Sequence, residues 1–418
     1  MSIRKRTWKT AKGAEKQAWI VDYVDQAGAR HIKTFDRKKE ADHFAATAHI
    51  EVRQGTHTAD SQSVTIAEAG ELWITTCEQS GLERSTLDQY RAHLDYHIIP
   101  YLGRMKLSQV SAATVRKFED DLLAGAPTLD SEGSEVAPRS QAMKKKVRGS
   151  LGAIVADAQE RGLVARNVVR ELRARRKPGR ENRAEKRQRG KLKIGVDIPT
   201  PDEIRALIGQ LRGRWRSFFL TAIFAGLRSS ELRGLRWADI DFEKRELHIR
   251  QRADRYNVIG RPKTEAGERS IPLPPMVLNA LREWRLVCPK GERDLVFPTG
   301  AGNIEGHTNI VLRGFIPAQV AAGVTTAMID GDGKPTLDKD GAPAMTGKYS
   351  GLHSLRHFFA SWCINRKVDG GLELPPKVVQ ERLGHSSITM TMDVYGHLFP
   401  RGDDLEELAL AEKSLLGP

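Results

Sequence analysis

One segment near the middle of the chain cannot contribute to a hydrophobic core. Residues 173–195 read RARRKPGRENRAEKRQRGKLKIG, which is dense in arginine and lysine and nearly free of apolar side chains. Such a segment cannot bury enough apolar surface to offset the entropy that ordering costs. It therefore predicts an interdomain linker, placed at 173–197. The 418 residues are then divided into separately folded regions on either side, as the length also favours.

The net charge limits the class of partner. Lysine and arginine number 67 against 53 aspartates and glutamates, which gives a net charge of +14 and a pI near 9.7. A polyanion is the expected partner of such a chain. Composition alone leaves DNA, the ribosome, a membrane surface and a merely soluble basic protein open. Because the basic segment joins two domains of a basic protein, contact with the DNA backbone is the favoured interpretation.

Several protein classes are disfavoured by what the sequence lacks. No apolar run approaches the roughly 20 residues of a spanning helix, and the basic N-terminus is not followed by the apolar stretch of a signal peptide. Cys77, Cys288 and Cys363 are far apart and have no CxxC spacing, so neither a disulfide framework nor a zinc site is expected. We expect a cytoplasmic protein, associated with the nucleoid when bound to DNA, that needs no cofactor and no metal.

Residues 1–60 have the pattern of a small unit of their own. Residues 16–36 alternate on both sides of a turn at Gly28 and predict a β-hairpin. A helical spacing follows, with Asp36 as the expected N-cap and Gly55 as the stop. We expect a three-stranded sheet and one helix. Nucleic-acid contact and a small folding or interaction module are both open, the first because the leading residues are basic: Arg4, Lys5, Arg6, Lys9 and Lys12.

Residues 64–172 predict an all-α domain. Apolar residues return every three or four positions in four stretches: 64–81, 86–103, 114–125 and 140–164. The sequence PTLDSEGSEVAPRS interrupts them and predicts a loop at 127–140. A compact helical bundle with basic helices is expected.

Residues 198–418 predict a mixed but mainly helical α/β domain. TPDEIRALIGQL opens with Pro201 and acidic residues, which suits a helix N-terminus. ELHIRQ and ERSIPL predict short strands. Residues 330–347, rich in Asp and Gly, superficially resemble a calcium loop. Lys334 and Gly341 occupy its fifth and twelfth ligand positions, so a surface hairpin is the better interpretation.

Four stretches of this region carry residues capable of chemistry. They are GLRSSELRGLRW (226–237), RPKTEAGERSIPL (261–273), LHSLRHFFAS (352–361) and RLGHSSITMTMDVYGH (382–397). Taken singly, each has an ordinary structural explanation. Arg228 and Glu231, three apart, would share a helix face as a surface ion pair. His353 and Arg356 fit a structural histidine beside a surface arginine, a lone Lys263 is ordinarily solvated, and Tyr395 fits a core aromatic.

Taken together, the same residues form a set suited to phosphoryl transfer without a metal. Arginine forks bind phosphate oxygens in pairs and stay charged. Histidine and lysine move protons near neutral pH when their pKa values are tuned, and a tyrosine hydroxyl can be a covalent nucleophile. The set comprises Arg228, Lys263, His353, Arg356, His385 and Tyr395.

The four stretches resemble the conserved boxes of the tyrosine recombinases, the phage integrase family, in the family's order. Arg228 matches its GLR-x-SEL box and Lys263 the lysine of its β-hairpin. His353 and Arg356 match the H-x-L-R-H box, His385 the LGH box and Tyr395 the nucleophile, ten residues after His385. The helical region before them resembles the family's core-binding, SAM-like domain. The resemblance therefore covers most of the chain and implies the tyrosine recombinase fold.

The resemblance also implies a mechanism. Tyr395 attacks a scissile phosphate, forms a 3′-phosphotyrosyl bond and releases a 5′-hydroxyl. Arg228 and Arg356 hold the non-bridging oxygens, Lys263 is the general acid for the leaving oxygen, and His353 assists proton transfer with the tyrosine. His385 hydrogen-bonds the phosphate. A 5′-hydroxyl of the partner strand then reverses the chemistry without ATP.

Partners are implied in the same way. Family members act as homotetramers on double-stranded DNA, and a C-terminal tail such as 403–416 packs on a neighbouring protomer, unless it packs on its own domain. The N-terminal unit resembles the arm-binding domain of integrases, which favours an integrase of a mobile element. An accessory excision factor is a further candidate partner.

Two other functions are weighed against this one. A small type IB topoisomerase shares the tyrosine, the arginines and the lysine, but it has no need of an arm-like domain or of the GLR-x-SEL and LGH boxes. A non-catalytic DNA-binding regulator on the same fold has no reason to keep all six residues. Integration and excision of a mobile element remain the main hypothesis.

Overall fold

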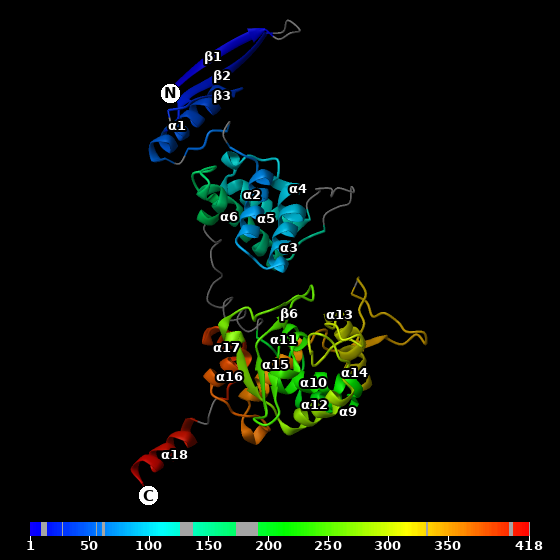
Figure 1. Ribbon diagram of the computed structural model, residues 1–418. Helices are drawn as coiled ribbons and strands as arrows, with labels where there is room; N and C mark the ends of the chain where they lie inside the picture. The colour runs from blue at the N-terminus through cyan, green and yellow to red at the C-terminus, as the bar shows by residue number, and fades with distance from the viewer. Residues whose placement is uncertain are drawn as a thin grey trace. The chain divides into compact units, whose positions relative to one another are not determined.

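The computed structural model describes the chain in separate stretches: residues 1–9, 15–26, 28–55, 57–60, 63–125, 137–172, 191–331, 333–400 and 404–417. Most of the predicted linker (173–190), most of the predicted loop at 127–140, Lys12, and Ala27 beside the Gly28 turn lie outside these residues. The chain divides into two compact units, 1–177 and 178–418 (Figure 1). In the described stretches, no helix is long and apolar enough to cross a bilayer.

The first unit begins with an antiparallel sheet in the order β1-β2-β3 and a helix (Figure 1). The elements are β1 (Ser2–Lys9), β2 (Glu15–Val24), β3 (Arg30–Phe35) and α1 (Lys38–Gln54). A small core forms because β2 buries Val21 and Tyr23 and α1 turns Ala41 and Ala45, one helical turn apart, toward them. Four of the basic residues expected to lead into the sheet, Arg4, Lys5, Arg6 and Lys9, instead lie on its first strand.

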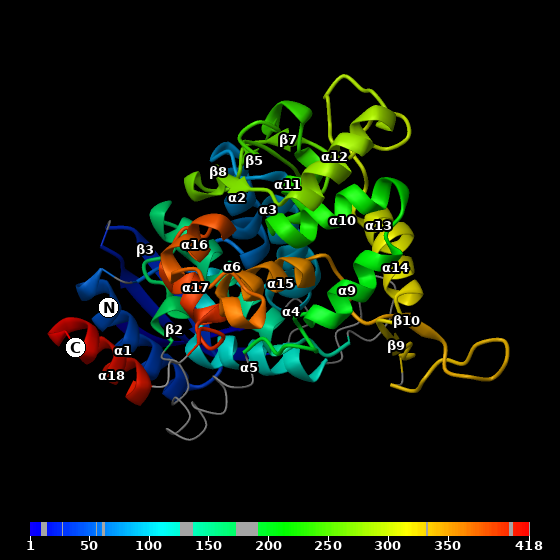
Figure 2. The same ribbon diagram turned by 90° about the horizontal axis from the view of Figure 1, so that it is seen from below.

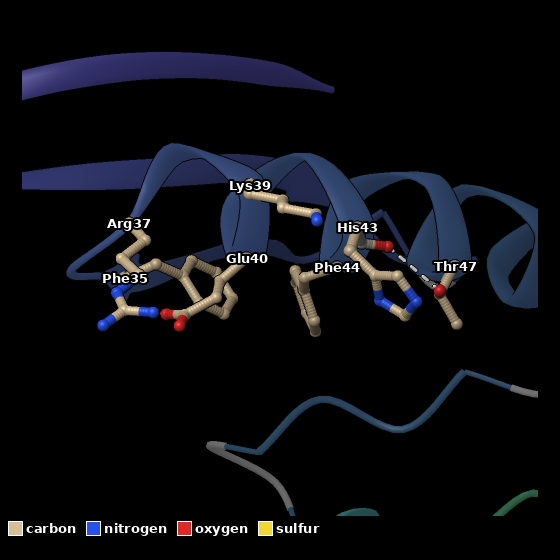
Figure 3. Close-up of a pocket in the computed structure, with 7 residues that line it drawn as sticks. All are labelled: Phe35, Arg37, Lys39, Glu40, His43, Phe44 and Thr47. Carbon is tan, nitrogen blue, oxygen red and sulfur yellow. Dashed lines mark hydrogen bonds between the residues drawn. The ribbon is translucent and has the colours of Figure 1, made fainter.

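The start of α1 differs from the prediction. Arg37, not Asp36, is the N-cap, and no side chain caps the helix there. Gly55 ends the helix in the left-handed conformation, with φ of 73°, as a glycine readily does. A shallow hollow of about 520 Å³ lies beside α1, between the end of β3 and the first turns of the helix (Figure 3). Phe35 and Phe44 supply much of its apolar wall.

The rest of the first unit is a helical bundle. Its elements are α2 (Ile66–Gln79), α3 (Arg84–His93), the π-helical turn η1 (Leu94–Ile98), α4 (Ile99–Leu102), η2 (Leu107–Gln109), α5 (Ala112–Ala124), α6 (Gln141–Glu160) and α7 (Val168–Glu171). Thr65 and Glu68 form a capping box that starts α2. The apolar faces of these helices meet around Trp73, Phe118 and Leu151.

Among the described residues, the second unit contains most of the helices and three small sheets. Its helical elements are α9 (Pro201–Gln210), α10 (Gly213–Ala225), α11 (Ser229–Gly234), η3 (Trp237–Asp239), η4 (Glu265–Gly267), α12 (Pro275–Val287), α13 (His307–Ile310), η5 (Val311–Phe315), α14 (Ile316–Ala321), α15 (His353–Ile364), η6 (Lys367–Asp369), α16 (Pro376–Leu383), α17 (Ile388–Tyr395) and α18 (Asp404–Leu416). The predicted helix after Thr200 is confirmed as α9, which a capping box of Thr200 and Glu203 starts.

The strands of the second unit form three small sheets. Strands β4 (Ile240–Asp241), β5 (Glu246–Ile249) and β8 (Arg269–Pro272) pair in the order β4-β5-β8, and β6 (Arg252–Ala253) pairs with β7 (Ile259–Gly260). Strands β5 and β8 confirm the predictions from ELHIRQ and ERSIPL. The predicted surface hairpin is also confirmed, because β9 (Thr325–Ala327) and β10 (Met345–Gly347) pair antiparallel at its base.

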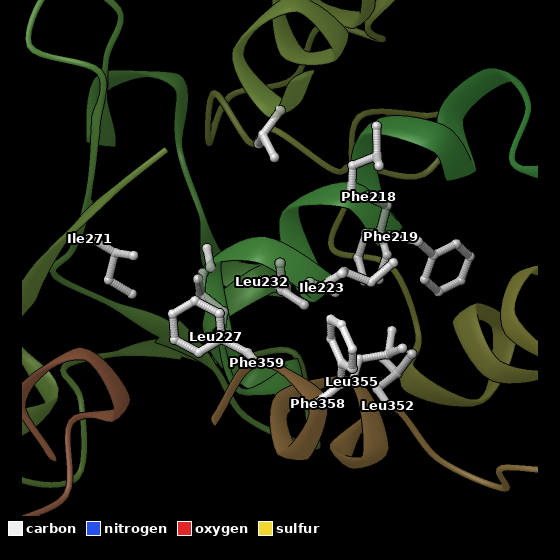
Figure 4. Packing of buried hydrophobic residues seen from close by; sticks show 14 of the residues in the cluster. Phe218, Phe219, Ile223, Leu227, Leu232, Ile271, Leu352, Leu355, Phe358 and Phe359 are labelled. Atoms are coloured by element: carbon white, nitrogen blue, oxygen red, sulfur yellow. The ribbon is translucent and has the colours of Figure 1, made fainter. Parts of the chain in front are cut away.

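The core of the second unit joins the elements that carry the predicted site. Helix α10 is buried from Ser217 to its end at Ala225, apart from a partly exposed Phe224. Phe218 and Phe219 from α10, Leu232 from α11, and Leu355 and Phe359 from α15 pack together (Figure 4). Helix α16 contacts both α15 and α17 (Figure 2). Burial of these side chains therefore fixes α11, α15, α16 and α17 relative to one another.

Candidate active site

Arg228 lies where α10 and α11 meet, but not on a helix face as predicted. It is the N-cap of α11, in extended backbone with φ of −67° and ψ of 149°. The Glu231 carboxylate accepts hydrogen bonds from the Arg228 backbone N–H at 2.9 Å and from its Nη1 at 2.8 Å. Nη2 donates to the carbonyl of Gly384 at 3.0 Å. The pairing expected from the sequence is therefore present, but through an N-capping arrangement.

Glu231 is a buried carboxylate shared by two arginines. Besides Arg228, it accepts hydrogen bonds from Nη1 and Nη2 of Arg269 at 3.2 and 2.9 Å. Burial alone would raise the pKa of Glu231, but the charge of Arg269, followed by those of Arg228 and Arg356, lowers it to about 2. Arg269 lies on β8 and was not predicted as a site residue. It ties Arg228, through Glu231, to the strand that follows Lys263.

Arg356 is buried, which corrects the alternative of a surface arginine. Its side chain is among the largest fully buried ones of the described residues. Nη1 donates to the Gly226 carbonyl at 2.7 Å, and Nη2 donates to the Leu383 carbonyl. Burial, and then the charges of Arg228 and Arg269, lower its pKa. Arg356 thus joins the turn before α11 to the end of α16, and its charge lies inside the domain.

Gly226 permits this junction, and its replacement gives a testable prediction. Its φ is +59°, and a Cβ there would lie 2.1 Å from Cδ1 of Phe359. Gly226→Ala is therefore expected to destabilise the protein by about 2–4 kcal/mol, from the left-handed backbone and the clash in the core. Urea unfolding of the two proteins measures this loss of stability. Gly209→Ala, in α9 with open space around the new methyl group, is the control and should be neutral or slightly stabilising. Equal changes in unfolding free energy for the two variants would contradict the special role of Gly226 at this junction.

His353 and His357 lie one turn apart at the start of α15. His353 is exposed, and its ring packs edge to face on His357 with centroids 4.5 Å apart. His357 is half-buried, and its Nδ1 lies 2.8 Å from the hydroxyl oxygen of Tyr395. Burial lowers the pKa of both histidines, that of His357 to about 4. The sequence prediction omitted His357, although it stands in the same LHSLRH stretch, four residues after His353.

His385 follows α16 and faces Tyr395. Its ring is stacked on the Tyr395 ring, at 4° between planes and 6.3 Å between centroids. Nδ1 lies 3.0 Å from Oγ1 of Thr391, a fully buried threonine. Burial, and then the charge of Arg356, lower the pKa of His385 to about 4. The ring is therefore neutral at physiological pH, with one nitrogen engaged by Thr391.

Tyr395 ends α17 and is buried, so it is part of the core as well as of the site. Only 2% of the residue is exposed. Burial raises its pKa to about 12, although the nearby charges of Arg356 and Arg228 act in the opposite direction. The hydroxyl is therefore protonated at neutral pH, and it lies within the electrostatic influence of both arginines.

Lys263 occupies a different kind of position. It is exposed, in the connection between β7 and β8, six residues before Arg269. The contacts above bring together Arg228, His353, Arg356, His385 and Tyr395, and Lys263 lies on the segment that Arg269 anchors. In the described parts of the chain, no group of His, Cys, Asp and Glu has the make-up of a metal site.

The sequence matches two family models. Residues 199–401 match the phage integrase family, and residues 65–123 match the phage integrase N-terminal SAM-like domain. One similar protein is the "Tyrosine recombinase XerC-like" of Caldanaerobacter subterraneus subsp. tengcongensis, 25% identical over 379 residues, which are 87% of this chain and 87% of the relative. Another is the putative prophage phiRv2 integrase of Mycobacterium tuberculosis, 26% identical over 408 residues, with 94% and 92% covered.

Solved structures show the same fold. The Tn1549 transposon integrase in complex with transposon right end DNA has a TM-score of 0.57 at 18% identity, covering 84% of this chain and all of the other. A lambda integrase tetramer bound to a Holliday junction has a TM-score of 0.50 at 17% identity, covering 92% and 96%. The fold is therefore that of the tyrosine recombinases, with a SAM-like helical domain before a largely helical second unit.

Proposed function

Because the chain belongs to the phage integrase family of tyrosine recombinases, we propose that its six matched residues carry out DNA cleavage and rejoining through a 3′-phosphotyrosyl bond at Tyr395. The chain is a site-specific recombinase by family. The observation that best supports this assignment of residues is the surroundings of the Tyr395 hydroxyl. It is held by one histidine, its ring is stacked on another, and two arginines act on its charge.

Arg228 and Arg356 are assigned to the non-bridging phosphate oxygens. A guanidinium has five N–H donors. The contacts described above use two N–H groups of each arginine, on carbonyls and a carboxylate that fix its orientation. The remaining donors can receive the negative charge that grows on the phosphate during attack. The surrounding bonds therefore orient both guanidinium groups before DNA binds.

His385 is assigned to a phosphate oxygen as a neutral donor. Its lowered pKa keeps the ring uncharged. With Nδ1 accepting from the Thr391 hydroxyl, the ring proton is on Nε2, which then donates to the phosphate. Lys263 is assigned as the general acid that protonates the leaving 5′-oxygen, and its exposed connection leaves it accessible to DNA. His353 is assigned to assist proton transfer at the tyrosine.

The domain roles form a second part of the proposal. Residues 1–60 are assigned to arm-type DNA, 64–172 to the core site as a SAM-like domain, 173–197 to a basic linker and 198–418 to catalysis. Strand β1 supports the first role, because it exposes Arg4, Lys5, Arg6 and Lys9 along its length.

The assembly proposal is a tetramer on double-stranded DNA. Strand exchange uses four active sites, and the lambda integrase structure is described as a tetramer on a Holliday junction. Helix α18 supports packing on a neighbouring protomer, since it exposes Leu408, Leu415 and Leu416. We further assign integration and excision of a mobile element, in the cytoplasm on nucleoid DNA, with an accessory excision factor as a candidate partner.

The test is covalent capture on DNA. A pool of nicked duplexes with randomised centres is incubated with the full chain, so that a cleaved strand loses its 5′-hydroxyl fragment and the adduct persists. We expect a detergent-resistant complex without added ATP or metal, whose DNA sequences share one motif and whose modified peptide contains Tyr395. An absent adduct, or one on another residue, would overturn the proposal and would favour a non-catalytic regulator.

A relaxation assay separates the topoisomerase alternative. On a supercoiled plasmid without the selected motif, a recombinase should show little processive relaxation. Complete relaxation of such a plasmid by catalytic amounts of protein would instead identify a type IB-like topoisomerase.

A further inference from the structure

The Tyr395 hydroxyl is hydrogen-bonded to a histidine outside the six matched residues. Nδ1 of His357 lies 2.8 Å from the hydroxyl oxygen, and the two rings meet edge to face with centroids 5.8 Å apart. The sequence comparison assigned the tyrosine proton to His353, one turn earlier on α15. His353 instead packs its ring on that of His357. The histidine at hydrogen-bonding distance from the nucleophilic oxygen is therefore His357.

The Tyr395 hydroxyl needs a proton acceptor before it can attack a phosphate. Its pKa is raised to about 12 by burial, so the phenol keeps its proton at neutral pH. Burial, and then the charges of His353 and Arg356, lower the pKa of His357 to about 4, so this ring is neutral and one of its nitrogens carries no proton. With the ring proton on Nε2, Nδ1 is an acceptor aimed at the phenol.

We propose that His357 is the general base of the cleavage step and receives the Tyr395 proton at Nδ1. The inference rests on the proposed function, because it adds a group to the same reaction. As the bond between the tyrosine oxygen and phosphorus forms, the bond between phosphorus and the 5′-oxygen breaks. The tyrosine proton moves to Nδ1 of His357, and the 5′-oxygen takes a proton from Lys263. In rejoining, the 5′-oxygen of the partner strand bonds phosphorus and gives its proton to Lys263, while the phosphotyrosyl bond breaks and Nδ1 of His357 returns its proton to the tyrosine oxygen.

Bound DNA supplies the charge that this transfer requires. Of the two site arginines, Arg356 and Arg228, the first disfavours a protonated His357 imidazole in the free protein, as does His353, whereas the carboxylate of Asp197 favours one. A phosphate held by these arginines brings negative charge next to them, and negative charge raises the basicity of a nearby histidine. The same two cations stabilise the phenolate oxygen. His357 therefore becomes a competent base only in the complex with DNA.

The experiment measures single-turnover cleavage by the full chain on two versions of the selected nicked duplex. One version has the natural 5′-oxygen at the scissile phosphate. The other has sulfur in its place, and a thiolate leaves without help from a general acid. The variants are His357→Ala, His357→Asn and, as the matched control, Lys263→Ala. Asparagine is polar, fills much of the same space and can accept the phenol hydrogen bond, but it cannot take up a proton. DNA affinity is measured first and should stay within about threefold of that of the unmodified protein.

We expect both His357 variants to cleave about 10²–10⁴-fold more slowly on the oxygen duplex, the usual range for a lost general base. The defect should persist on the sulfur duplex, whereas the defect of Lys263→Ala should largely disappear there. Three results would overturn the inference: near-normal cleavage by His357→Ala, recovery by His357→Asn to within about tenfold of normal, or rescue of His357→Ala by sulfur. If the unmodified protein forms no adduct on either duplex, the proposed function fails instead. If His357→Ala loses DNA binding, His357→Asn decides the outcome.

Discussion

Replacing Tyr395 by phenylalanine is expected to abolish covalent attachment to DNA and to leave the fold intact. The change removes one oxygen atom from the proposed reaction. The phenylalanine ring keeps the core position of Tyr395 and its stacking on His385. Adduct formation should therefore fall by more than about 10⁴-fold, because no other group takes the place of a missing nucleophile. Single-turnover cleavage of the selected nicked duplex measures the loss.

The stability of this variant provides the control. Its lost hydroxyl leaves Nδ1 of His357 without the tyrosine partner, which costs no more than about 1–2 kcal/mol of unfolding free energy. Binding to an intact duplex should remain, since no charge changes. A Tyr395→Phe protein that still became covalently attached would show that another residue is the nucleophile. If Tyr395→Phe failed to fold, its loss of cleavage would say nothing about the nucleophile. The unfolding free energy in urea is therefore measured for each protein whose cleavage rate is compared.

The sequence predicted local pairing at the candidate site, such as that of Arg228 with Glu231, but not the surroundings of the residues. Local spacing is visible in a sequence, so GLRSSEL and LHSLRH could be recognised and the ion pair of Arg228 with Glu231 expected. What spacing does not show is which groups meet from distant segments. Arg269 reaches Glu231 across 38 residues, and the Arg356 guanidinium bonds a carbonyl 130 residues away. Neither the burial of Arg356 nor the second arginine on Glu231 could be predicted from neighbours along the chain.

The same reasoning explains the omission of His357. A histidine four residues after His353 and next to a buried arginine has several ordinary structural explanations. Its contact with Tyr395 depends on how α15 and α17 pack, over a separation of 38 residues. Long periodic segments such as α9 were predictable because the helix signal is local and repeated. The two-residue strands β6 and β7 carry no such signal, because two residues are too few to show a period and only their pairing with each other defines them.

Glu231→Gln is expected to have the largest effect on stability among single changes in the site. Glutamine has the shape of glutamate but no charge. Arg228 and the buried Arg269 would then lose their shared counter-charge, with Arg356 close by. Breaking a buried ion pair from one side costs about 3–5 kcal/mol, because the remaining charges stay buried and uncompensated. Urea unfolding at pH 7 measures the change. Glu268→Gln, at an exposed position beside Arg269, is the matched control and should alter stability little.

The lowered pKa of Glu231 also predicts how the stability difference between the two proteins changes with pH. The pKa of Glu231 is about 2 in the folded protein against an ordinary value of 4.5. A carboxylate with a lowered pKa stabilises the fold fully above its unfolded value and loses that contribution as the pH falls toward the folded value. The advantage of the unmodified protein over Glu231→Gln should therefore be constant from pH 7 to about 5.5. Below that pH the difference in unfolding free energy should narrow, by about 1.4 kcal/mol at pH 3.5.

The arginines provide an independent check on the cause. If uncompensated charge destabilises Glu231→Gln, then adding Arg269→Met should recover part of the loss, since it removes one of the excess buried cations. Cleavage should stay low in both proteins, because Arg228 would still lack the carboxylate that orients it. A stability difference that did not narrow in acid, together with no recovery in the double variant, would mean that Glu231 acts by shape alone. Its charge would then not be what holds Arg228 in place.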